Sequence, residues 1–195
     1  MPNTPAGTVY TIGHSTRTVV ELSILLRQVA VDLLIDVRAF PRSRTNPQFN
    51  SDVLPQALVA VGLGYRHLPT LGGRRRRASA GAPSVNSLWR NSSFRNYADY
   101  SATDEFRVGF AELLALSGRH CCAIMCAEAL WWQCHRRIIT DYLLVEGLAV
   151  THIMGNHNLV RATLTPGAQR APDGAMVYRG PAPVQAPLHG GRARG

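Results

Sequence analysis

The chain has 195 residues, of which 46% are apolar, and its formal net charge is +9 with all 21 basic residues arginine. This length suits one full α/β domain and is too short for two ordinary ones. No apolar run approaches the length of a membrane span, and the first residues lack the basic and then apolar pattern of an export signal. We therefore expect a cytoplasmic protein with no membrane partner, and the positive charge favours an anionic small molecule or a nucleic acid as ligand.

Short apolar runs alternate along the chain with segments of helical periodicity. The pattern predicts strands at residues 8–12, 31–35, 65–68, 121–125 and 150–153, and helices at 19–29, 52–61, 94–116 (one or two helices) and 136–146. The alternation predicts an α/β fold, a single three-layer domain over residues 8–160 with a mostly parallel sheet flanked by helices. Residues 161–195 are rich in Pro, Gly, Ala and Arg without periodicity, which predicts a disordered tail.

Polar side chains follow several of the predicted strands. After the first two strands they are His14, Ser15, Asp36 and Arg38, with Arg42 and Arg44 in the next loop. Residues 126–136 follow the fourth strand. Because the carboxyl ends of parallel strands share one edge, we expect these groups to converge in one cleft. Asp36 stands two residues before Arg38, where its carboxylate can orient the guanidinium.

The stretch from residue 126 to 137 concentrates reactive side chains at a predicted turn from strand to helix. Cys134 lies at the helix start, where the helix dipole and Arg136 would lower the pKa of a thiol. The same helix start predicts an anion site with Arg136 as its principal side chain. Three interpretations of Cys126 remain open: a buried apolar residue, a reactive thiol or a metal ligand. Glu128 is either a general acid or base, or the partner of an arginine.

A metal site is only weakly indicated. Cys126, Cys134, His135 and His14 could bind zinc, but the chain lacks the short Cys-x-x-Cys pair of structural zinc sites. We therefore predict no metal ligand and leave the cofactor open. The clustering of all four cysteines within residues 121–134 favours reduced thiols over a disulfide framework.

Trp131 and Trp132 lie in the predicted loop rather than at a core-facing period. We expect one indole to stack on a base or sugar, and the other to fill the gap between the loop and the helix.

Several ordered motifs resemble one known family. They are Thr11-Ile12-Gly13-His14-Ser15, Asp36-Val37-Arg38 with Pro41, Ser43 and Phe49, Tyr65 to Pro69 with Leu71-Gly72-Gly73, Asn96-Tyr97-Ala98, Cys126-Ala127-Glu128 with Cys134-His135-Arg136, and Gly147 with Val150-Thr151-His152-Ile153. Over residues 8–155 the chain resembles the domain of unknown function 488 family. The resemblance implies a compact α/β domain with these polar motifs clustered, and it implies no particular activity.

Two classes of function fit these residues. The first is an enzyme acting on a nucleotide-like or nucleic-acid-derived anionic substrate, and we favour it because an anion pocket has little need for two thiols and a carboxylate. Its predicted catalytic residues are Glu128, Cys134, His135 and His14, and its ligand-binding residues are Ser15, Asp36, Arg38, Arg42, Arg44, Cys126, Trp131, Trp132 and Arg136. The second is a noncatalytic sensor or adaptor that binds a nucleotide or a nucleic-acid end in the same pocket.

Overall fold

The protein is built around a six-stranded sheet in the order β3-β2-β4-β1-β5-β6. The structure, a computed structural model, describes residues 7–76 and 84–180. The strands of the sheet are β1 (Thr8–Gly13), β2 (Leu33–Asp36), β3 (Gly64–His67), β4 (Cys122–Cys126), β5 (Ala149–Gly155) and β6 (Asn158–Arg161). The first five strands are parallel and β6 pairs with β5 in the antiparallel sense. The α/β fold with a mostly parallel sheet is therefore confirmed.

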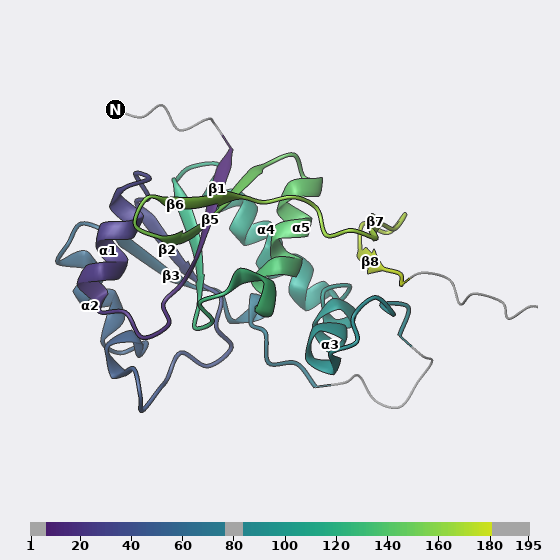
Figure 1. Cartoon of the computed structure of the whole chain (residues 1–195), viewed down its shortest axis with the longest axis horizontal. Helices are drawn as coiled ribbons and strands as arrows, with labels where there is room; N and C mark the ends of the chain where they lie inside the picture. The colour runs from purple at the N-terminus through teal and green to yellow at the C-terminus, as the bar shows by residue number, and fades with distance from the viewer. Residues whose placement is uncertain (1–6, 77–83, 181–195) are drawn as a thin grey trace, which may run out of the picture.

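Helices cover both faces of the sheet (Figure 1). They are α1 (Val19–Arg27), α2 (Leu54–Val59), α3 (Ser92–Tyr100), α4 (Asp104–Ser117) and α5 (Arg136–Val145), with short 3-10 turns η1 (Pro47–Phe49), η2 (Pro69–Leu71) and η3 (Trp131–Gln133). Strand β4 shows how the two cores divide. Cys122, Ile124 and Cys126 pack with α4 and α5, whereas Ala123 and Met125 pack with α1 and α2. Successive side chains along a strand point to opposite faces of the sheet, so each face packs against its own helices and the fold has three layers.

The predicted segment 94–116 contains two helices rather than one. Thr103 separates them because its side chain accepts a hydrogen bond from the backbone N–H of Phe106 and caps α4. Helix α1 begins with a complete capping box, in which Thr18 and Glu21 satisfy each other's backbone N–H groups.

The chain beyond residue 160 is ordered further than its composition predicts. Strands β7 (Ala168–Arg170) and β8 (Met176–Tyr178) form a small antiparallel pair. Met176 and Tyr178 are buried in the core, and the Tyr178 hydroxyl donates a hydrogen bond to Asp141 of α5 at 3.0 Å. The predicted tail must therefore be corrected, since residues 161–180 belong to the fold. The disorder predicted for residues 181–195 lies outside the described residues.

Candidate functional site

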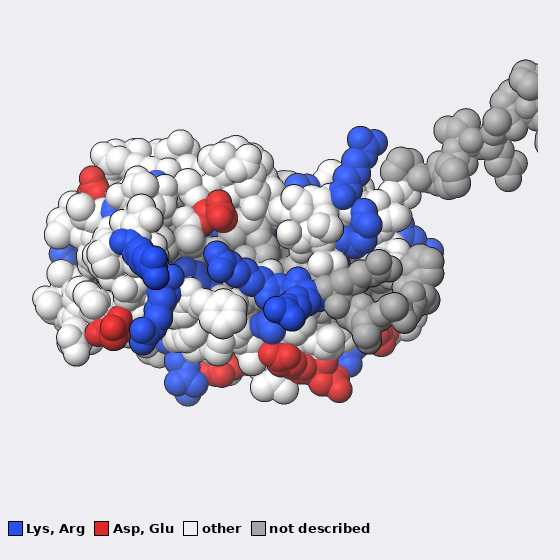
Figure 2. Space-filling model, turned by 90° about the horizontal axis from the view of Figure 1, so that it is seen from below, with Lys and Arg blue, Asp and Glu red and all other residues white. Residues whose placement is uncertain are grey.

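The carboxyl ends of the three central strands meet at one edge of the sheet, as the sequence predicts. In the register, Gly13 of β1 pairs with Cys126 of β4, and Asp36 of β2 pairs with Met125 of β4. The loop after β1 is tied to the loop after β4, because His14 N–H donates to the Cys126 carbonyl at 2.8 Å. Figure 2 looks onto this edge from below, and arginine side chains form bands across it.

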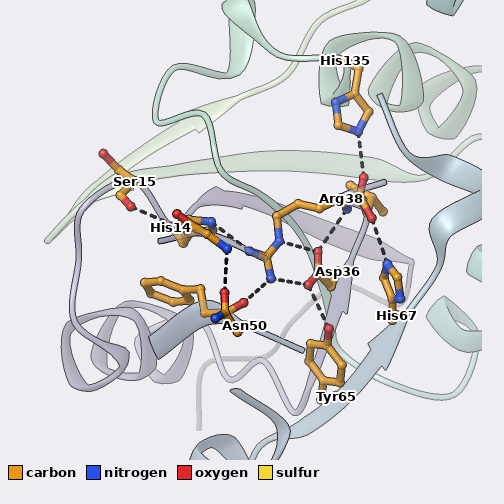
Figure 3. Close-up of polar contacts among 11 residues, drawn as sticks. His14, Ser15, Asp36, Arg38, Asn50, Tyr65, His67 and His135 are labelled. Atoms are coloured by element: carbon orange, nitrogen blue, oxygen red, sulfur yellow. Dashed lines mark hydrogen bonds and ion pairs between the residues drawn. The ribbon is translucent and has the colours of Figure 1, made fainter. Parts of the chain in front are cut away.

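A buried ion pair organises the part of the edge that follows β2 (Figure 3). Asp36 is fully buried, and its carboxylate accepts hydrogen bonds from the backbone N–H and the side chain of Arg38 and from the Tyr65 hydroxyl. Arg38, 6% exposed, also donates to the Phe49 carbonyl at 2.7 Å. The guanidinium therefore fixes the loop that contains Phe49, which agrees with the predicted orienting role of Asp36.

His14 belongs to the same network. Arg38 NH1 donates to its Nε2 at 3.2 Å, so Nδ1 carries the proton and donates to the Ser15 carbonyl at 2.9 Å. The ring stacks on Phe49 at 4.2 Å between centroids. Burial lowers the pKa of His14 to about 4. A neutral, fully bonded imidazole is placed to support the loops, and it does not line the pocket described below.

Two thiols and an imidazole meet beside this network. Cys126 ends β4, Cys134 follows η3, and His135 precedes α5. The Nδ1 atom of His135 lies 3.6 Å from the Cys134 sulfur and 3.9 Å from the Cys126 sulfur. Nε2 of the same ring lies 3.0 Å from the Val37 carbonyl oxygen. Because a carbonyl can only accept, Nε2 carries a proton, and the Nδ1 atom faces the two sulfurs.

The two thiols have opposite acidities. The hydrogen bond with Cys134, and then burial, raise the pKa of Cys126 well above its ordinary value. Burial opposes ionisation of Cys134, but the Cys126 hydrogen bond and the nearby His135 and Arg136 together hold its pKa well below the ordinary value. Of the two thiols, Cys134 is therefore the one that ionises more readily, and Cys126 is placed to donate a hydrogen bond to it.

Arg136 lies beneath the cluster rather than on an open surface. Its side chain is 1% exposed, and its donors contact the Cys134 sulfur at 3.3 Å, the Thr11 hydroxyl and the Glu128 carbonyl. The donors of Arg136 are thus used inside the protein, where the guanidinium contacts the Cys134 sulfur. This internal role competes with the predicted role in binding an anionic ligand.

A pocket with a volume of about 230 Å³ opens above the cluster. Its lining combines reactive, charged and aromatic side chains: Cys126, Glu128, Cys134, His135, Arg38, Arg74, Phe40 and Phe94, with Ala39, Gly73, Ser93, Ala127 and Gln133. The sequence analysis did not select Phe40, Gly73, Arg74, Ser93, Phe94 or Gln133. A signal existed for two of them, since Gly73 and Arg74 stand in the Gly-Gly-Arg run directly after η2.

Steric contacts explain why glycines occupy positions 72 and 73. A Cβ atom on Gly72 would overlap the backbone of Ala39, and a Cβ atom on Gly73 would overlap the His135 ring. Only hydrogen at these positions lets the loop after η2 close over the imidazole.

The remaining predicted site residues lie outside the pocket lining. Ser15 has a positive φ of 50° and binds the Ala127 carbonyl through its backbone N–H. Arg42 and Arg44 are exposed in the loop after β2. Trp131 stacks on His152 at 4.3 Å between centroids, whereas Trp132 is 43% exposed. Trp131 therefore packs against β5 and Trp132 faces solvent, and the predicted stacking of an indole on a base or sugar stays a prediction.

The fold and the site define a three-layer α/β protein with a thiol and imidazole cluster at the carboxyl edge of its sheet. The chain belongs to the family described as Domain of unknown function DUF488, whose model matches residues 18–143. The resemblance found in the sequence is thus confirmed. No curated protein and no solved structure matches the chain. Across residues 7–76 and 84–180, none of the helices has the length and apolar character needed to cross a bilayer.

Proposed function

We propose that this protein is an enzyme acting on a compact, nucleotide-like anionic substrate in the pocket above Cys126, Cys134 and His135. One observation carries the proposal: two cysteine sulfurs and an imidazole lie together in a pocket that Glu128 and Arg74 also line. Perturbed ionisable groups that gather in a pocket are a recognised mark of reactive sites.

The pocket volume limits the substrate. About 230 Å³ is slightly below the roughly 300 Å³ at which most ligand sites begin, so a small molecule fits better than a long polymer segment. Phe40 and Phe94 offer ring surface to a base, and Arg74 offers a guanidinium to a phosphate. In this assignment Arg74 takes the role that the sequence suggested for Arg38 and Arg136, whose donors are engaged within the protein.

Glu128 is the proton-transfer group of the proposal. Glu128 is exposed and lines the pocket beside Cys126, while its backbone carbonyl accepts a hydrogen bond from Arg136. A carboxylate fixed through its backbone but open to the pocket can reach a bound substrate, and such a group contributes roughly 10²–10⁴-fold to a rate.

The test begins with a thermal-shift screen of nucleotides, nucleosides and sugar phosphates, followed by turnover assays on the compounds that bind. Glu128→Gln should retain binding and lose turnover by roughly 100-fold or more. Arg74→Ala should weaken binding of phosphate-bearing compounds by roughly 10-fold or more, since a charge-assisted hydrogen bond is lost. Arg119→Ala is the matched control, because Arg119 is an exposed arginine before β4, at the opposite edge of the sheet.

The alternative function, a noncatalytic sensor or adaptor, predicts a different result. The exposed arginines Arg42 and Arg44 beside the site favour a sensor or adaptor that holds a nucleotide or a nucleic-acid end. Salt-dependent binding without turnover of any bound compound would support that function and contradict the enzyme.

A further inference from the structure

The donor atoms of Cys126, Cys134 and His135 form a set suited to a thiophilic ion. The two sulfurs and one imidazole nitrogen all lie within 4.8 Å of one another. Thiolate sulfur and imidazole nitrogen are the preferred ligands of Zn²⁺. Cys126 and Cys134 are buried, so the donors sit in a site with restricted solvent access.

The distances match those around a tetrahedral ion. With Zn–S of about 2.3 Å and Zn–N of about 2.0–2.1 Å, tetrahedral angles place sulfur and nitrogen about 3.6 Å apart. His135 Nδ1 lies 3.6 Å from the Cys134 sulfur and 3.9 Å from the Cys126 sulfur. Both sulfur-to-nitrogen separations are thus within about 0.3 Å of the tetrahedral value, and the two sulfurs lie within 4.8 Å of one another.

The surroundings orient the donors as metal sites require. Zinc-bound histidine usually donates its second ring N–H to a carbonyl or a carboxylate, and His135 donates Nε2–H to the Val37 carbonyl. Val37 is positioned directly after β2 by the neighbouring Asp36–Arg38 ion pair. Arg136 donates to the Cys134 sulfur, which favours the thiolate that an ion needs.

The number of ligands distinguishes the kind of site. Structural zinc takes four protein ligands, whereas catalytic zinc takes three and keeps a position for water or substrate. The cluster supplies three ligands among the described residues, and all three line the pocket together with Glu128.

We propose that Cys126, Cys134 and His135 bind one Zn²⁺ ion whose fourth coordination position opens into the pocket. The ion binding stands by itself, and its consequence for catalysis rests on the proposed function. Held by these three residues, the ion would lower the pKa of a water at its open position and so supply the nucleophile of a hydrolytic reaction. Glu128 would take the proton of that water and return it to the leaving group when the bond from the attacked carbon to the leaving group breaks.

Metal binding is measured without any substrate. The full chain is stripped with a chelator under reducing conditions and titrated with Zn²⁺ and with Co²⁺. We expect one equivalent of either ion, and a Co²⁺ spectrum with sulfur-to-cobalt charge-transfer bands and the visible bands of a tetrahedral ion. Cys134→Ser and His135→Gln should each weaken Zn²⁺ binding by roughly 100-fold or more, beyond the roughly 10–100-fold typical of losing a residue that only hydrogen-bonds to a metal ligand. Circular dichroism checks that each variant is folded.

Cys121→Ser is the matched control. Cys121 is a cysteine outside the cluster, and its sulfur contacts the Val29 carbonyl. This variant should bind one equivalent with unchanged affinity. Equal losses in Cys121→Ser and Cys134→Ser would overturn the site.

Four further outcomes are decisive. No binding by a folded, fully reduced chain overturns the ion site, as does a Cys126–Cys134 disulfide that forms readily while Zn²⁺ fails to bind. Turnover that persists in chelator overturns the catalytic role of the ion while leaving the proposed enzyme intact. One bound equivalent with no turnover supports the site and contradicts the enzyme.

Discussion

Replacing Asp36 with asparagine should destabilise the protein strongly. The carboxylate is fully buried and accepts from the backbone and side chain of Arg38 and from Tyr65. Asparagine removes the charge, and its amide NH₂ must face one of these donors. A buried arginine then loses its counter-charge, which costs about 3–5 kcal/mol. At roughly 2–4 °C per kcal/mol for a chain of this size, the melting temperature should fall by about 6–20 °C.

Urea denaturation followed by circular dichroism measures the free energy of unfolding of Asp36→Asn. Tyr65→Phe is the matched comparison, because it removes one donor to the same carboxylate and leaves the ion pair in place. Its expected cost is about 1 kcal/mol. If Asp36→Asn cost no more than Tyr65→Phe, the ion pair would not be what holds the loop after β2.

Two further predictions concern neighbours of the cluster. Gly73→Ala should displace the His135 ring, because the added Cβ would overlap it, and the charge-transfer absorption of bound Co²⁺ should fall. Gly118→Ala is the control: its Cβ would meet only atoms beyond 3.6 Å, so the spectrum should stay unchanged. Burial, and then the charge of Arg136, lower the pKa of His152 to about 4, so the unfolded chain takes up a proton below about pH 6.5 that the folded chain does not. The free energy of unfolding should therefore fall by about 2 kcal/mol between pH 7 and 5 on account of this residue, and His152→Gln should lose that part of the fall; an unchanged pH dependence in the variant would show that another group is responsible.

The arrangement of the sheet could be predicted because it depends on simple periodicities. The apolar run ending at Cys126 and the run ending at Asp36 are both buried on two faces, which is characteristic of parallel strands. From this, the convergence of the two polar turns at one edge follows without any knowledge of tertiary contacts. The boundary between α3 and α4 at Thr103 also has a local signal, since Thr-Asp-Glu is a common helix start.

The pocket walls could not be predicted in the same way. Phe40, Arg74 and Phe94 come from loops and a helix start far apart in the sequence, and no periodicity links them. The docking of β8 was hidden for a related reason. It depends on single anchors such as Tyr178 within a segment whose composition resembles a tail. Apart from the Gly-Gly-Arg run that includes Arg74, neither arrangement leaves a local signal, because each depends on contacts over long sequence separation.

The direction of a charged side chain was the least predictable quantity. Arg38 and Arg136 both stand beside reactive residues, and a binding role was the natural expectation from the sequence. In the structure each is buried and satisfies acceptors of the protein itself.

This use of arginine explains how the centre keeps its shape. Arg38 fixes the chain at Val37 through Asp36, the Val37 carbonyl fixes the tautomer of His135, and Arg136 holds the Cys134 sulfur from below. Each link sets the position of the next group, so Nδ1 of His135 lies 3.6 Å from the Cys134 sulfur. A catalytic or metal-binding centre needs that order before any ligand arrives. In the proposed enzyme, Arg74 and Glu128 act on the substrate from the pocket walls, while the buried contacts hold the two sulfurs and the imidazole in place.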